Sequence, residues 1–104
     1  MKAVLSTMAG LGLALAAIGA QAEVTDAMNK AGCMACHAVD KKVIGPSFKD
    51  IAAKYKGQDV LAKLTEKVRK GGSGSFGPVP MAPNTPDKIN DADLKTAIEQ
   101  ILKS

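Results

Sequence analysis

Two cysteines and the only histidine of the chain lie within five residues, CMACH at positions 33–37. Three chemistries use such a cluster: thiol–disulfide exchange, metal binding, and covalent haem attachment through C-x-x-C-H. In the last case, two thiols three positions apart reach the vinyl groups on one side of a porphyrin, and the adjacent imidazole turns to the iron. The surrounding sequence has to distinguish these chemistries.

The first two chemistries lack support elsewhere in the chain. An exchanger normally carries its C-x-x-C on the first helix of a βαβ unit, and no segment here alternates with the period of a strand. Structural zinc takes four ligands, so these three residues would need an additional carboxylate. We therefore predict one covalently bound haem c, with Cys33 and Cys36 as thioethers and His37 as an axial iron ligand.

The sixth iron position cannot be a second histidine of this chain, which leaves a methionine, a lysine, water or an open site. Met28 falls on the apolar face of a predicted helix and Met34 inside the attachment motif, so core filling and local packing explain them better. Met81 lies in GPVPMAPN between Pro80 and Pro83, which restrict the backbone and present its side chain in a defined direction. We predict Met81 as the sixth ligand, with a gap-filling methionine as the alternative.

The beginning of the sequence has the layout of a secretory signal. Residues 1–22 contain Lys2, an apolar run and the small-residue ending Ala20-Gln21-Ala22. An uncleaved membrane anchor is the alternative, because the run approaches the length of a membrane span. We expect cleavage after Ala22, a single domain at 23–104 in the periplasm, and no stable membrane association after cleavage.

Composition and charge narrow the class of partner. Without Lys2, the formal net charge of +4 falls to +3, and no arginine-rich run or aromatic stacking platform is present. Nucleic acid is therefore excluded as a partner, and acidic proteins are favoured. The adjacent basic pairs, Lys41–Lys42 and Arg69–Lys70, read as solvated surface. Three aromatic residues give little core, which a large flat cofactor would supply.

Helical periodicity predicts an all-α fold of four short helices joined by loops. The loop at about 71–86 is rich in Gly, Pro and Ser and has no period, which is typical of a functional segment. The predicted helices cover about 24–31, ended by Gly32; 48–55, with Ser47 as N-cap and Gly57 as stop; about 59–70, ended by Gly71-Gly72; and a last helix capped by Asn90 or Asp91, with Leu94, Ala97, Ile98, Ile101 and Leu102 on its apolar face.

The ordered set CMACH, VIGP, KGGSG and PVPMAPN, followed by a C-terminal amphipathic helix, resembles the small bacterial class I cytochromes c of the c-551/c-552 (cytochrome c8) type. The resemblance covers residues 23–104 and implies the cytochrome c fold, with one haem edge exposed. It implies the same haem-binding residues, namely Cys33 and Cys36 as thioethers and His37 and Met81 as the proximal and distal ligands. It adds Pro46, whose carbonyl accepts a hydrogen bond from the proximal imidazole, and Asn84, which donates to the region of the methionine ligand.

The sequence departs from that family in its aromatic residues. Many relatives carry a tryptophan in the glycine loop, where Phe76 stands here, and another in the last helix, whereas this chain contains no tryptophan. Phe76 keeps an apolar wall but lacks the N–H that would hold a haem propionate.

We expect a soluble one-electron carrier, not an enzyme, that works as a monomer between redox proteins of a respiratory chain. These partners would dock at the exposed haem edge, and lysines would steer them: Lys41, Lys42, Lys63, Lys67 and Lys70. The rival interpretations are a haem sensor or small peroxidase with an open sixth site, and a thiol–disulfide exchanger.

Overall fold

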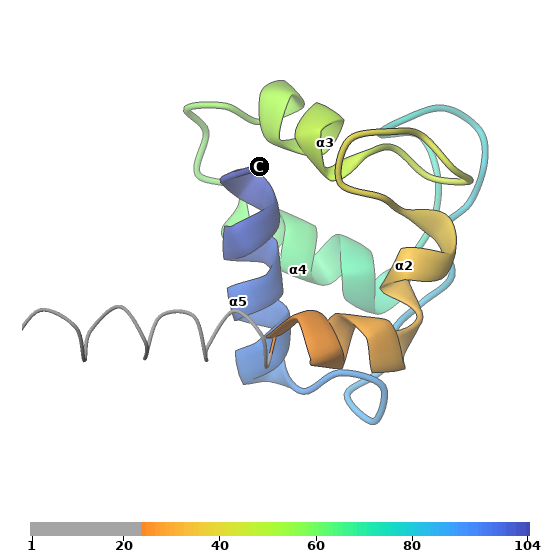
Figure 1. Ribbon diagram of the computed structural model, residues 1–104, viewed down its shortest axis with the longest axis vertical. Helices are drawn as coiled ribbons and strands as arrows, with labels where there is room; N and C mark the ends of the chain where they lie inside the picture. The colour runs from red at the N-terminus through yellow and green to blue at the C-terminus, as the bar shows by residue number, and fades with distance from the viewer. Residues whose placement is uncertain (1–23) are drawn as a thin grey trace, which may run out of the picture.

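The computed structural model describes residues 24–104, so the predicted signal at 1–22 and its cleavage site lie outside the described residues. The described part is built from helices and loops without a strand, which confirms the all-α class. Within it, no helix combines the length and the apolar character needed to cross a bilayer. The elements are a helical segment at 24–31, α2 (Cys33–Cys36), α3 (Phe48–Lys54), α4 (Leu61–Lys70) and α5 (Asp91–Leu102) (Figure 1).

Local signals set most of these boundaries. Ser47 caps α3, as predicted, because its hydroxyl accepts a hydrogen bond of 3.0 Å from the amide of Asp50. At α5 the choice between two candidate caps falls on Asn90, whose side-chain oxygen accepts from the amide of Asp93 at 2.8 Å. The predicted start of α4 near Asp59 is wrong by two residues. Val60 precedes the helix with its side chain buried and its backbone outside the helical region.

Helix α5 is the centre of the packing, in contact with both α3 and α4. Figure 1 shows it upright, with the helical segment 24–31 running sideways from its lower part and α3 near its upper end. Two buried clusters result, and they confirm the predicted apolar face of α5 and the core role of Met28. One joins Val24, Met28, Phe48 and Ala97, and the other joins Ile89, Leu94 and Ile98 to Leu61, Leu64 and Val68 of α4.

The protein side chains alone make a thin core. Among residues 24–104, no large side chain falls below 2% exposure. Large apolar side chains instead remain exposed on α2, on the loop between α2 and α3 and on the loop between α4 and α5: Met34, Val39, Val43, Ile44, Phe76 and Val79. For Met34, at 39% exposure, the predicted local packing is only partial. These surfaces fit a fold completed by a large apolar group, because isolated apolar patches of this kind are otherwise costly in a small domain.

Candidate functional site

Helix α2 begins and ends with the two cysteines. Cys33 and Cys36 are one helical turn apart, so their side chains lie on the same face. Both are half-buried free thiols, and Cys33 packs against the cluster around Phe48. Burial raises the pKa of the Cys33 thiol, and its backbone hydrogen bond only partly offsets this. An exchanger needs a thiol with a lowered pKa, so this environment disfavours thiol–disulfide exchange.

His37 follows α2 directly, with an extended backbone, and its ring is held from two sides. Its Nδ1 lies 2.7 Å from the carbonyl oxygen of Pro46, the contact that the resemblance implied. A carbonyl only accepts, so Nδ1 carries the proton and Nε2 keeps the lone pair that a metal would use. The ring of Phe48 stacks against the imidazole at a centroid distance of 5.6 Å. The ligand role of His37 itself stays a prediction.

The loop between α2 and α3 folds back onto the end of α2. The amides of Ile44 and Gly45 both donate to the carbonyl of Cys36, at 3.2 and 2.7 Å. A Cβ added to Gly45 would lie 2.6 Å from Cε1 of His37, so only glycine lets the backbone pass this close to the ring. The loop thereby places the Pro46 carbonyl where the imidazole can reach it.

Met81 is held by the segment that ends α4. Gly72 and Met81 exchange two backbone hydrogen bonds of 2.9 Å, which form an isolated antiparallel bridge. Gly71 has a φ of 73°, and a Cβ there would lie 2.4 Å from the Met81 carbonyl oxygen. The backbone of Gly71 thus passes so close to that of Met81 that only glycine fits there.

Asn84 anchors the same loop three residues further on. Its amide N–H donates to the carbonyl of Val68 at 3.0 Å, and its side-chain nitrogen donates to the carbonyl of Ala82 at 3.1 Å. The side chain therefore supports the backbone next to Met81, and its predicted donation to the methionine side remains untested.

The predicted site residues form two groups. Cys33, Cys36, His37 and Pro46 meet at α2 and the loop after it, whereas Met81 and Asn84 meet at the end of α4. No hydrogen bond or ring contact among residues 24–104 joins one group to the other.

Arg69 is a residue whose role the sequence did not reveal. Read with Lys70 as solvated surface, it has a side chain that is only 17% exposed. Its guanidinium bonds the carbonyls of Asn84 and Ile89 and the carboxylate of Asp91. Lys70 does lie on the surface, paired with Glu66 one turn away. The prediction of a solvated Arg69 was wrong because its partner Asp91 lies 22 residues away in the sequence, where local patterns carry no signal.

Phe76 also has contacts that the sequence did not indicate. Its ring meets Tyr55 edge-on, with centroids 6.4 Å apart. The ammonium of Lys54 lies 4.4 Å from the Phe76 centroid and donates to the carbonyl of Ser75. The glycine loop is thus tied to α3 by a cation, in a chain that has no tryptophan there.

Comparisons with known proteins agree with this geometry. A family model described as cytochrome c matches residues 21–103. Cytochrome c2 of Rubrivivax gelatinosus is 53% identical over 76 residues, which are 72% of this chain and 89% of the relative. Cytochrome c-551 of Azotobacter vinelandii is 47% identical over 72 residues, 68% of this chain and 84% of the relative. The crystal structure of wild-type Nitrosomonas europaea cytochrome c552 matches with a TM-score of 0.67 at 44% identity, covering 76% of this chain and 96% of that one.

Two thiols one turn apart, followed by an imidazole whose Nε2 is available, are the donor set that haem c requires. The exposed apolar side chains of both loops suit the same group. With the family matched over most of its length, the chain belongs to the cytochrome c family, as a class I electron-transport cytochrome of the c-551/c-552 type with one covalently bound haem c.

Proposed function

We propose that the protein is a periplasmic one-electron carrier with a His/Met-ligated haem, in which Cys33 and Cys36 form the thioethers, His37 is the proximal ligand and Met81 the distal one. The observation that carries the proximal half is the hydrogen bond of 2.7 Å between His37 Nδ1 and the Pro46 carbonyl oxygen. It fixes the tautomer and the ring orientation, and it makes Nε2 a better donor.

The distal half is supported by the backbone around Met81. Two hydrogen bonds to Gly72 and the neighbouring Asn84 contacts hold this one methionine in an irregular loop. Met28 is committed to the core, with 6% exposure. Met34 lies inside the attachment motif, too close to His37 in sequence to reach the opposite face of the group that His37 ligates.

The proposed ligand set favours electron carriage over catalysis. When bound, the haem supplies a one-electron couple between ferric and ferrous iron. His37 and Met81 together leave no position for a substrate, and the thioether of Met81 favours the reduced state. The residues of this chain thus bind and tune a redox centre and transform no substrate.

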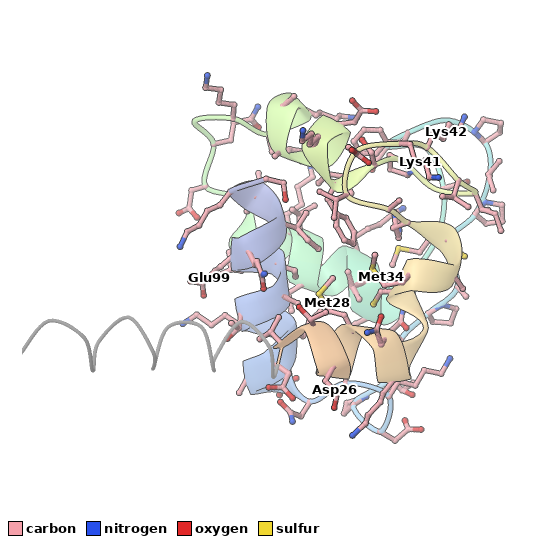
Figure 2. The ribbon with its side chains drawn as sticks, viewed as in Figure 1. Asp26, Met28, Met34, Lys41, Lys42 and Glu99 are labelled. Carbon is pink, nitrogen blue, oxygen red and sulfur yellow. The ribbon has the colours of Figure 1, made fainter. Side chains whose placement is uncertain are left out.

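The surface proposed for redox partners is the haem edge that would remain exposed, and we infer that the loop between α2 and α3 would border it because that loop follows the attachment motif. That loop carries Lys41 and Lys42, two adjacent lysines that are both exposed (Figure 2). Exposed lysines suit brief docking to an acidic protein surface, because opposite charge speeds the encounter. The protein is proposed to act as a monomer.

The experiment that tests this proposal is the optical spectrum of the purified haem protein, oxidised and reduced, with carbon monoxide added to the reduced form. We expect a c-type α-band, a weak far-red band from ferric iron bound to sulfur, and no shift with carbon monoxide. Met81→Ala should lose the far-red band and bind carbon monoxide, because the sixth position opens. Met34→Ala is the matched control and should keep the wild-type spectrum.

Two outcomes would contradict the proposal. A wild-type protein that lacks the far-red band and binds carbon monoxide rapidly would have an open sixth site, as in a sensor or small peroxidase. A band that survives Met81→Ala but disappears in Met34→Ala would move the distal ligand to α2.

A further inference from the structure

The guanidinium of Arg69 is the most heavily bonded charged group among the described residues that the proposed haem site does not use. Its Nη1 lies 2.8 Å from the Ile89 carbonyl oxygen and 3.2 Å from that of Asn84. Its Nη2 lies 2.5 Å from Oδ1 of Asp91. A side chain with 17% exposure and three acceptors has a fixed position, unlike a surface lysine.

The three acceptors of Arg69 belong to one stretch of chain, which leads from Met81 to the first residue of α5. Asn84 lies three residues after Met81, Ile89 is buried against α5, and Asp91 begins that helix. A single side chain at the end of α4 therefore ties down both the middle and the end of this connection.

Met81 lies between two attachments to α4. On one side, Gly72 pairs with its backbone, just after α4 ends. On the other, Asn84 bonds Val68 through its amide and Arg69 through its carbonyl, at 3.0 and 3.2 Å. Loss of the Arg69 bonds would leave Asn84 attached to α4 through Val68 alone, by its amide at 3.0 Å and by a longer side-chain bond of 3.4 Å. The carbonyls of Asn84 and Ile89 would lose their charged donor.

We propose that Arg69 is a positioning residue for the axial methionine: by clamping the connection from Asn84 to Asp91, it keeps Met81 where it can stay on the haem iron. The inference rests on the proposed function, in which Met81 is the distal ligand. Arg69 does not touch the iron; it acts through the backbone that presents Met81.

The clamp is stronger than a surface ion pair for a physical reason. Hydrogen bonds from a charged donor are shorter and stronger than neutral ones. The low exposure of Arg69 limits competition from water at its two carbonyl acceptors, whereas the Asp91 carboxylate is exposed and contributes less. Truncation of Arg69 would leave the Asn84 and Ile89 carbonyls to find other donors. The loop would then sample arrangements in which Met81 is off the iron.

The population with Met81 off the iron can be measured by competition with imidazole in the ferric protein. Imidazole takes the sixth site only when the methionine has left, so its apparent dissociation constant falls as that population grows. We expect Arg69→Met to bind imidazole about tenfold more tightly than wild type, since the apparent constant scales inversely with the competent fraction. The titration is monitored by the far-red band, which disappears as imidazole replaces the methionine.

Two controls separate positioning from general destabilisation. Lys95→Met removes one exposed positive charge from α5, and Thr96→Gly weakens the same helix at an exposed position. Both should keep the wild-type imidazole affinity. Arg69→Lys and Asp91→Asn remove part of the clamp and should give intermediate affinities, and they replace Arg69→Met as the test if that variant does not retain haem.

The outcomes distinguish this inference from the proposed function. If wild type itself lacks the far-red band, Met81 is not the ligand and both fail together. If wild type has the band and the Arg69 and Asp91 variants bind imidazole as wild type does, the proposed function stands and the positioning role is overturned. An equal gain in affinity for Thr96→Gly would overturn it as well.

Discussion

Gly71 occupies a position where no other residue type fits, directly after α4 and at the start of the loop that contains Met81. Its φ of 73° and ψ of −157° belong to a region that only glycine populates without strain. A Cβ there would also meet the Met81 carbonyl oxygen at 2.4 Å, against a backbone that cannot swing away. A side chain at Gly71 would therefore strain the backbone and also collide with Met81, and both effects would disturb the bridge between Gly72 and Met81.

Gly71→Ala should therefore lower the free energy of unfolding by at least ~1–3 kcal/mol, the cost of holding a side chain in such a conformation. It should also weaken the far-red band, because the bridge that carries Met81 is displaced. Urea unfolding of the haem protein and its oxidised spectrum measure the two effects.

Gly57→Ala is the matched control for Gly71. Gly57 also has a positive φ, of 78°, but a Cβ there meets nothing within 4 Å. It should lose stability from strain alone and keep its far-red band. Equal spectra for the two variants would show that the contact between Gly71 and Met81 does not position the ligand.

At the scale of elements, α5 is the helix against which α3, α4 and the segment 24–31 pack. Its N-cap is Asn90, which accepts from the amide of Asp93. Asn90→Ala should lower the free energy of unfolding by about 1 kcal/mol, because an amide at the helix start loses its acceptor. Urea unfolding checks the value.

Asn90→Ser is the control for this cap, because serine also accepts the N-terminal amide hydrogen bond. It should retain most of the stability. A serine variant as unstable as the alanine variant would mean that Asn90 matters through another contact, such as its bond to the Asp93 carboxylate.

The helices and the attachment motif were predictable because their signals are local. Periodicity marks the apolar face of α5, and Ser47 lies three residues before the amide it caps. The predicted start of α4 was too early because Val60, which lies just before the helix, is also buried. An apolar residue at that position fits the helical spacing although its backbone is not helical.

The contacts around Met81 were not predictable, since they join residues distant in sequence. The pairing of Gly72 with Met81 and the bonds from Arg69 to Asn84 and Asp91 depend on the path of the whole loop. Periodicity and spacing carry no information on such a path. The sequence indicated that the loop matters, but not what holds it.

At the scale of the whole molecule, the lysines expected to steer partners differ in their surroundings. Lys70 is paired with Glu66 at 2.7 Å, and Lys63 lies 5.5 Å from the centroid of the Tyr55 ring. Among residues 24–104, neither Lys41 nor Lys42 forms an ion pair, and both are exposed on the loop after α2 (Figure 2). Because they are adjacent and exposed, these two lysines should contribute strongly to the positive field around that loop.

The double change Lys41→Gln and Lys42→Gln should slow oxidation of the reduced protein by hexacyanoferrate(III), by about two- to threefold at low ionic strength, because steering of an anion depends on local charge. The difference should fade as salt shortens the Debye length. The matched control, Lys95→Gln with Lys103→Gln, removes the same charge from α5 and its end. If both doubles slow the reaction equally, net charge governs the encounter, because a local docking surface would respond only to its own lysines.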